Sequence, residues 1–164
     1  MPVKQITVER FNVVSAKPLG DVLAAIQAAV GHPNIAAMQR DVIAATSYSE
    51  MESVIDKAIG PSGLMQFMHL DMGMYLAKGS AGTTPESHRL LVGNPLIMRR
   101  MAQHVPDTAS YAPVTILIDE RADGVHLSYN RMASYLACYG SEAASAVAQE
   151  LDRKVEAMLT AAAL

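Results

Sequence analysis

The sequence contains one cysteine, no tryptophan and no run of basic residues. With Cys138 as the only cysteine, no intrachain disulfide can form, which suits a reducing compartment. The 13 Lys and Arg residues are outnumbered by 16 Asp and Glu residues, and the formal net charge is −3. Proteins that bind the nucleic-acid backbone concentrate positive charge on one surface, so we expect no nucleic-acid partner here.

Long apolar segments are also missing from the sequence. No stretch approaches the ~20 apolar residues that a helix needs to span a bilayer. The first 15 residues carry Lys4, Glu9 and Arg10, and therefore lack the continuous apolar region of a signal peptide. These absences predict a cytoplasmic protein that has no membrane segment.

The patterns that are present predict one α+β domain over residues 1–164. The hydrophobic fraction, 51%, is close to that of ordinary globular domains. Alternating and helical periodicities predict the order β-α-(αα)-β-β-α-β-β-α, a largely antiparallel sheet with helices packed on one face. Strands are predicted at 5–14, 64–78, 87–92, 111–120 and 125–130, and helices at 19–30, 34–45, 47–59, 94–104 and 141–161.

Local signals set several of these boundaries. Asn34 and Ser47 stand where helix N-caps are favoured, and Glu50 lies at capping-box spacing from Ser47. The Asp123-Gly124 pair predicts a tight hairpin turn. The final helix has an apolar stripe at helical spacing, formed by Val147, Leu151, Val155, Met158 and Leu159.

The predicted strand 64–78 alternates between two kinds of side chain. One face is apolar and is expected to be core: Met68, Leu70, Met72, Met74 and Leu76. The other face is mixed and is expected to be half buried or to line a cavity: Phe67, His69, Asp71, Gly73 and Tyr75.

Three short motifs carry a resemblance to a known family. They are Gly93-Asn94-Pro95 at a helix start, Tyr111-Ala112-Pro113 before a central strand, and Ser128-Tyr129 at the end of a hairpin. In these motifs the chain resembles the DUF302 family from about residue 64 to 131, and its last helix fits the same pattern. The resemblance implies a TATA-binding-protein-like α+β fold and a homodimer, but no reaction, because the family has no settled activity.

His69 and Asp71 are the first candidates for chemistry. They are two residues apart in a predicted strand, so they share a face, and His88 or His126 could join them from another strand. Imidazole and carboxylate groups are ligands for first-row metals. Hydrogen-bonded histidines on a half-exposed face would explain the same pattern without a metal.

Methionines surround His69, and thioethers with imidazole can bind Cu(I) or haem. Met68, Met72 and Met74 also fit a core face, where methionine fills irregular gaps. The sequence lacks the Gly-x-Ser-x-Gly, P-loop and Gly-x-Gly-x-x-Gly motifs, and Cys138 sits in an apolar run typical of a packed thiol.

A second candidate site favours an anion. The helix that begins at Asn94 presents free backbone N–H groups, and Arg89 is near in the sequence. Tyr129 brings a phenol into an apolar strand and needs a hydrogen-bond partner. Ordinary helix capping and a buried, hydrogen-bonded tyrosine are the alternatives.

Three hypotheses for function follow from these candidates. The first is a homodimer that binds a small anionic or carboxylated ligand between sheet and helices, through His69, Asp71, Tyr75, Arg89, Asn94, His126 and Tyr129. The second is a metal- or haem-binding protein or a small enzyme that uses His69 and Asp71, with His126 as a further metal ligand. The third is a structural dimer without a ligand. The sequence identifies no catalytic residue and no cofactor.

Overall fold

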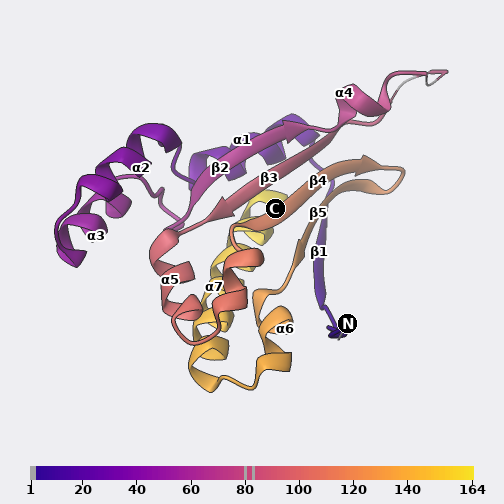
Figure 1. Ribbon diagram of the computed structural model, residues 1–164. Coiled ribbons are helices and arrows are strands. Elements are labelled where there is room, and N and C mark those ends of the chain that lie inside the picture. Colours follow the sequence, from indigo (N-terminus) through magenta and orange to yellow (C-terminus); the bar gives the residue numbers. More distant parts are fainter. Residues whose placement is uncertain (1–2, 80, 83) are drawn as a thin grey trace.

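A five-stranded antiparallel sheet is the centre of the computed structural model, which describes residues 3–79, 81–82 and 84–164 (Figure 1). The strand order is β1-β5-β4-β3-β2, and every neighbouring pair is antiparallel. The strands are β1 (Arg10–Ser15), β2 (Met65–Asp71), β3 (Ser87–Gly93), β4 (Val114–Arg121) and β5 (Gly124–Asn130). The expected α+β class and antiparallel sheet are confirmed.

The helices fall into a core layer and smaller outlying pieces. The core layer is α1 (Leu19–Ala29), α5 (Pro95–Ala102) and α7 (Glu142–Ala163). The other helices are α2 (Ile35–Ala44), α3 (Tyr48–Asp56), α4 (Gly73–Leu76) and α6 (Met132–Leu136), with 3₁₀ turns at Pro106–Ser110 and Ala137–Tyr139. No helix in the described part of the chain is long and apolar enough to cross a bilayer.

The main core lies between one face of the sheet and the layer α1, α5 and α7. Leu90, Ile116 and Leu127 from the strands are fully buried there. They meet the predicted stripe of α7, in which Val155 and Leu159 are also fully buried. The opposite face, which we call the open face, carries exposed side chains such as Arg89 and Thr115.

Helices α2 and α3 form a separate small lobe, seen at the left of Figure 1. Asn34 and Ser47 cap them as predicted, accepting hydrogen bonds from the N–H groups of Ala37 and Glu50. The lobe has its own core, which contains Met38, Ile55 and Met65.

The two ends of the lobe meet at a pair of glycines. A Cβ on Gly31 would lie 1.9 Å from the carbonyl oxygen of Ala58, and one on Gly60 would lie 2.4 Å from the carbonyl carbon of Val30. Any side chain at either position would push the two backbones apart, so this junction requires glycine.

The predicted strand 64–78 is wrong beyond Asp71, where the chain turns into α4. The Asp71 carboxylate accepts a hydrogen bond from the N–H of Met74, which favours a turn over an extended strand. The predicted faces are wrong as well. Met68 and Met74 are 47% and 57% exposed, and Leu76 is 56% exposed.

A β-bulge explains the exchange of faces in β2. Gln66 pairs with Val92 and Met68 pairs with Leu91, so Phe67 is an extra residue without a partner in the ladder. Beyond the bulge, His69 lies opposite Leu90 and turns to the helix-covered face, while Met68 turns to the open face.

Two other strands begin later than predicted. β1 is an edge strand whose only partner is β5, and Arg10 already lies opposite the last residue of β5. The described residues before Arg10, 3–9, therefore extend past the end of β5. Before β4, residues 106–110 form a 3₁₀ turn that delays the strand to Val114.

We predict that Val155→Asp unfolds the domain. Val155 is fully buried on α7, and an unpaired charge in such a place costs about 3–5 kcal/mol, much of the ~5–15 kcal/mol that stabilises a typical domain. Urea unfolding followed by circular dichroism measures the loss. The exposed neighbour Ala157→Asp is the control and should change stability by less than about 1 kcal/mol. Equal stability of the two variants would show that this side of α7 is not buried.

Candidate functional site

The predicted site residues are spread over several places in the fold. His69 and His88 come together at one end of β2 and β3, with His69 Nε2 3.1 Å from His88 Nδ1. Burial and the neighbouring His88 lower the pKa of His69. Asp71 lies opposite His88 in the ladder. In the described chain, no three His, Cys, Asp or Glu side chains are grouped so that they could hold a metal ion.

His126 does not lie with His69 and Asp71. Its neighbour Leu127 is on the helix-covered face, so His126 is on the open face, where it bonds to Asp123 (2.9 Å) and Asn12 (3.3 Å). Of the two histidines that could join His69, His88 therefore does so and His126 does not, because His126 lies on the opposite face of the sheet.

Asn94 and Tyr75 are also separated from His69. Asn94 lies just beyond the far end of β3, where its side-chain oxygen accepts from the N–H of Leu96 (2.8 Å) and its amide donates to the carbonyl of Gly63 (3.0 Å). The side-chain oxygen of Asn94 thus caps α5, and its amide group is bonded to the loop at Gly63. Tyr75 is on α4 and is 66% exposed.

Tyr129 is buried on the helix-covered face, where its hydroxyl donates to the carboxylate of Asp152 on α7. Burial, and secondly the negative charge of Asp152, raise the pKa of Tyr129 far above its ordinary value. The Tyr129 phenol is therefore a buried, hydrogen-bonded group, which is the alternative to a ligand-binding role that the sequence left open.

Asp152 is the buried carboxylate that the sequence analysis missed. Besides Tyr129, it accepts from the backbone N–H groups of Met132 (2.7 Å) and Ala133 (3.1 Å), the first two residues of α6. Burial raises the pKa of Asp152. One turn further along α7, Glu156 binds Arg131 with two hydrogen bonds of 2.6 and 3.1 Å. Together, Asp152 and Glu156 fix the start of α6 to α7.

Helix α6 borders a groove of about 480 Å³ at one end of the open face, which it lines through Tyr135. Strands β4 and β5 form its floor, and Arg10 and Arg89 stand on its two sides. Its lining is Arg10, Arg89, Leu91, Leu117, Ser110, Tyr111, Ala112, Pro113, Val114, Thr115, Ser128, Tyr129, Asn130 and Tyr135. These described lining residues include two arginines and no carboxylate.

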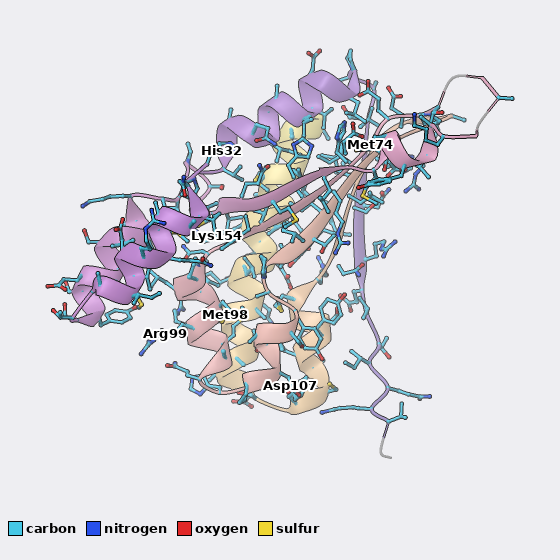
Figure 2. The ribbon with its side chains drawn as sticks, turned by 45° about the horizontal axis from the view of Figure 1, so that its top comes forward. His32, Met74, Met98, Arg99, Asp107 and Lys154 are labelled. Atoms are coloured by element: carbon cyan, nitrogen blue, oxygen red, sulfur yellow. The ribbon has the colours of Figure 1, made fainter. Side chains whose placement is uncertain are left out.

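Two tyrosines form the end wall of the groove. The rings of Tyr111 and Tyr135 are stacked, with centroids 4.7 Å apart and planes 12° from parallel. The Tyr111 hydroxyl is 2.9 Å from that of Tyr139, which follows α6. The hydrogen bond with Tyr111, and then Asp107, raise the pKa of Tyr139. Figure 2 labels Asp107 at the same lower end of the molecule as α6.

The side chains of the groove have spare hydrogen-bond donors. Arg10 Nε donates to the Asn130 oxygen (2.9 Å), and the Asn130 amide donates to the Tyr135 hydroxyl oxygen (3.0 Å). Arg89 makes a long contact of 3.5 Å to the Thr115 hydroxyl oxygen. Arg10, Arg89 and Thr115 are exposed, so their remaining donor hydrogens face the solvent of the groove and are accessible to a ligand.

Of the predicted ligand residues, only Arg89 and Tyr129 line this groove. Sequence reasoning missed Arg10, Thr115, Asn130 and Tyr135. A usable signal was present, because Arg10 and Asn12 alternate with apolar residues in β1 as Ser128 and Asn130 do in β5. Without the pairing of β1 with β5, nothing in the sequence places Arg10 beside Asn130.

Comparison with known proteins identifies the family and the fold. Residues 38–162 match the family profile described as "Domain of unknown function DUF302". The crystal structure of an uncharacterized conserved DUF302 protein from Bacillus stearothermophilus is similar, with a TM-score of 0.65 and 10% sequence identity. The similarity covers 94% of this chain and 98% of that one. No protein with a curated description matches.

We predict that Asp152→Asn changes how stability depends on pH. Because the folded-state pKa of Asp152 is raised, the folded protein binds a proton more tightly than the unfolded chain does. The stability of the wild type relative to Asp152→Asn is therefore greatest at low pH, and it falls as pH rises from about 4 through the folded pKa. Urea unfolding at pH 4 and pH 7 measures the difference. An advantage of the wild type that grows towards pH 7 would mean that the carboxylate is instead stabilised in its charged form.

Proposed function

The chain belongs to the DUF302 family, whose function is unknown, and on that premise we propose that it binds a small anion in the groove between Arg10 and Arg89. This keeps the anionic ligand expected from the sequence but moves it from the space between sheet and helices to the open face. The observation that supports it most directly is the lining of the groove, which holds two arginines and several hydroxyl and amide groups but no carboxylate, because an anion with several oxygens is the partner that such donors favour.

The ladder geometry lets both guanidinium groups reach one ligand. Ile116 lies opposite Tyr129, so the next residues, Thr115 and Asn130, are neighbours on the open face. Backbones of adjacent strands are roughly 5 Å apart. Arg10 contacts Asn130 and Arg89 contacts Thr115, so the two positive charges approach each other over β4 and β5. A carboxylate above this point has donors on both sides.

The motifs that carry the family resemblance also gather here. Tyr111-Ala112-Pro113 and Ser128-Tyr129 line the groove. Gly93-Asn94-Pro95 lines a smaller pocket that shares Ala112 and Pro113 with it. Motifs far apart in the sequence are thus brought to one end of the sheet, as expected of residues that serve one site.

We expect Arg89→Gln and Arg10→Gln to weaken acetate binding about fivefold each. That factor corresponds to about 1 kcal/mol, which is reasonable for a charge-assisted hydrogen bond at a half-open site. Titration followed by two-dimensional ¹H–¹⁵N NMR, with the amides of Thr115 and Asn130 as reporters, gives the affinity. The exposed Arg40→Gln on α2 removes the same charge elsewhere and is the matched control. Equal affinities in all three variants would exclude the groove as the anion site.

We also propose a homodimer formed through α4, in keeping with the sequence expectation. This short helix follows the last residue of β2, Asp71, at the end of the sheet opposite to Asn94, where Figure 2 labels Met74. Met74 and Tyr75 are 57% and 66% exposed, and exposed apolar patches commonly mark interfaces. A cytoplasmic location suits such an assembly, because a reducing compartment keeps the exposed Cys138 from forming disulfides.

Light scattering at high micromolar protein tests the dimer. The wild type should give twice the mass of one chain, and Tyr75→Ser should give the mass of a monomer, since it removes a large ring from the interface. Ile43→Ser, a change on α2 at a residue that is 83% exposed, should remain dimeric. A monomer mass for the wild type would remove this proposal without touching the groove.

A further inference from the structure

We infer that the ligand of the groove is a carboxylate with an aromatic or similarly compact apolar group, and that this group occupies a second pocket beside Gly93. The inference rests on the proposed anion site and adds the other half of the ligand.

The second pocket is small and almost entirely apolar. It has a volume of about 130 Å³ and lies between the end of the sheet and helices α5 and α7. Phe67, Pro113, Met98, Met101 and Leu151 supply most of its wall. Met98 is labelled on α5 in Figure 2. Apolar cavities of about 150 Å³ stay dry and take up a benzene ring, so this space is of the right size and character for one ring.

Two local features keep this pocket open. Phe67 is the bulged residue of β2, and its side chain lines the pocket. At Gly93 the absent side chain leaves space, since a Cβ there would lie 3.4 Å from Cβ of Pro113 and 3.7 Å from the Phe67 ring. A larger residue at 93 would fill the opening between these two walls.

The pocket and the groove share one segment of chain in their linings. Ala112, Pro113 and Val114 line both, and Thr115, which Arg89 contacts, follows directly. Two residues of extended chain span roughly 6–7 Å. A ligand can therefore place a carboxylate at Arg89 and Thr115 and its ring beside Pro113, if a short alkyl chain separates the two.

The groove and the pocket differ in the chemical character of their linings. The groove supplies two guanidinium groups and free hydroxyl donors, whereas the pocket wall offers aliphatic, thioether and aromatic surface. The Asn94 side chain, the polar group nearest the pocket, is already satisfied by Leu96 and Gly63. A wholly polar anion would leave the pocket unused, and a neutral hydrocarbon would leave the arginines unpaired.

The test compares acetate with phenylbutyrate, which carries the same carboxylate and a ring at the end of a propyl chain. By NMR titration, phenylbutyrate should bind about tenfold to a hundredfold tighter than acetate, the factor expected from burying one phenyl group. Phe67→Ala, which removes a wall, and Gly93→Val, which fills the opening, should each reduce this ratio to about threefold or less. Both should leave acetate binding unchanged. Tyr48→Ala, an aromatic deletion on α3 outside both spaces, should keep the full ratio.

The outcomes separate this inference from the proposed function. If acetate binds through the arginines but phenylbutyrate binds no tighter, or if both pocket variants keep the full ratio, the apolar half is wrong and the anion site stands. If neither compound shifts the amides of Thr115 and Asn130, both fail. Circular dichroism of each variant shows whether it is folded, and the two pocket variants act in opposite directions on volume, so one unfolded variant leaves the other as the test.

Discussion

The arrangement of the groove depends on one buried carboxylate. Asp152 on α7 accepts hydrogen bonds from the Tyr129 hydroxyl at the end of β5 and from the first two N–H groups of α6. Those N–H groups belong to a helix only five residues long, which has almost no stability of its own in water. Asp152 acts together with the Arg131–Glu156 pair and with Met132 and Leu136, which are fully buried in the core, to hold α6 in place. Helix α6 in turn carries the Tyr135 ring that closes the groove. Burial raises the pKa of Asp152, which shows that its charged form carries a desolvation penalty. The hydrogen bonds that hold α6 offset part of this penalty.

Helix α7 therefore has two structural roles, one in the core and one at the groove. Its apolar stripe forms the core under the sheet, where Val155 and Leu159 are fully buried. Asp152 and Glu156, one turn apart, bind the chain segment that leaves β5. The same helix thus packs under the sheet and holds the segment that carries the end wall of the groove. Arg89 and Arg10 need no such support, because ladder pairing already fixes where their strands lie.

Much of the fold could be predicted because its signals are local. The caps at Asn34 and Ser47, the hairpin at Gly124 and the stripe of α7 each depend on a few neighbouring residues. The candidate site could not be predicted in the same way. One extra residue at Phe67 exchanges the faces of His69 and Met68, and alternation in the sequence does not reveal a bulge. Arg10 and Arg89 are 79 positions apart in the sequence numbering and line one groove only because of a strand order that the sequence did not disclose.

The glycine junction at the base of the α2–α3 lobe has a consequence for how this chain can vary. Gly31 and Gly60 bring the two ends of the lobe into backbone contact, so the segment between them leaves the domain and returns at a single point. The lobe is also fixed to the sheet through its core, because Met65, the first residue of β2, is fully buried against Met38 and Ile55. Variation in length is therefore best tolerated at the loop between α2 and α3, where Thr46 and Ser47 are exposed. Foreign sequence inserted there would leave Met65 covered and β2 in register with β3.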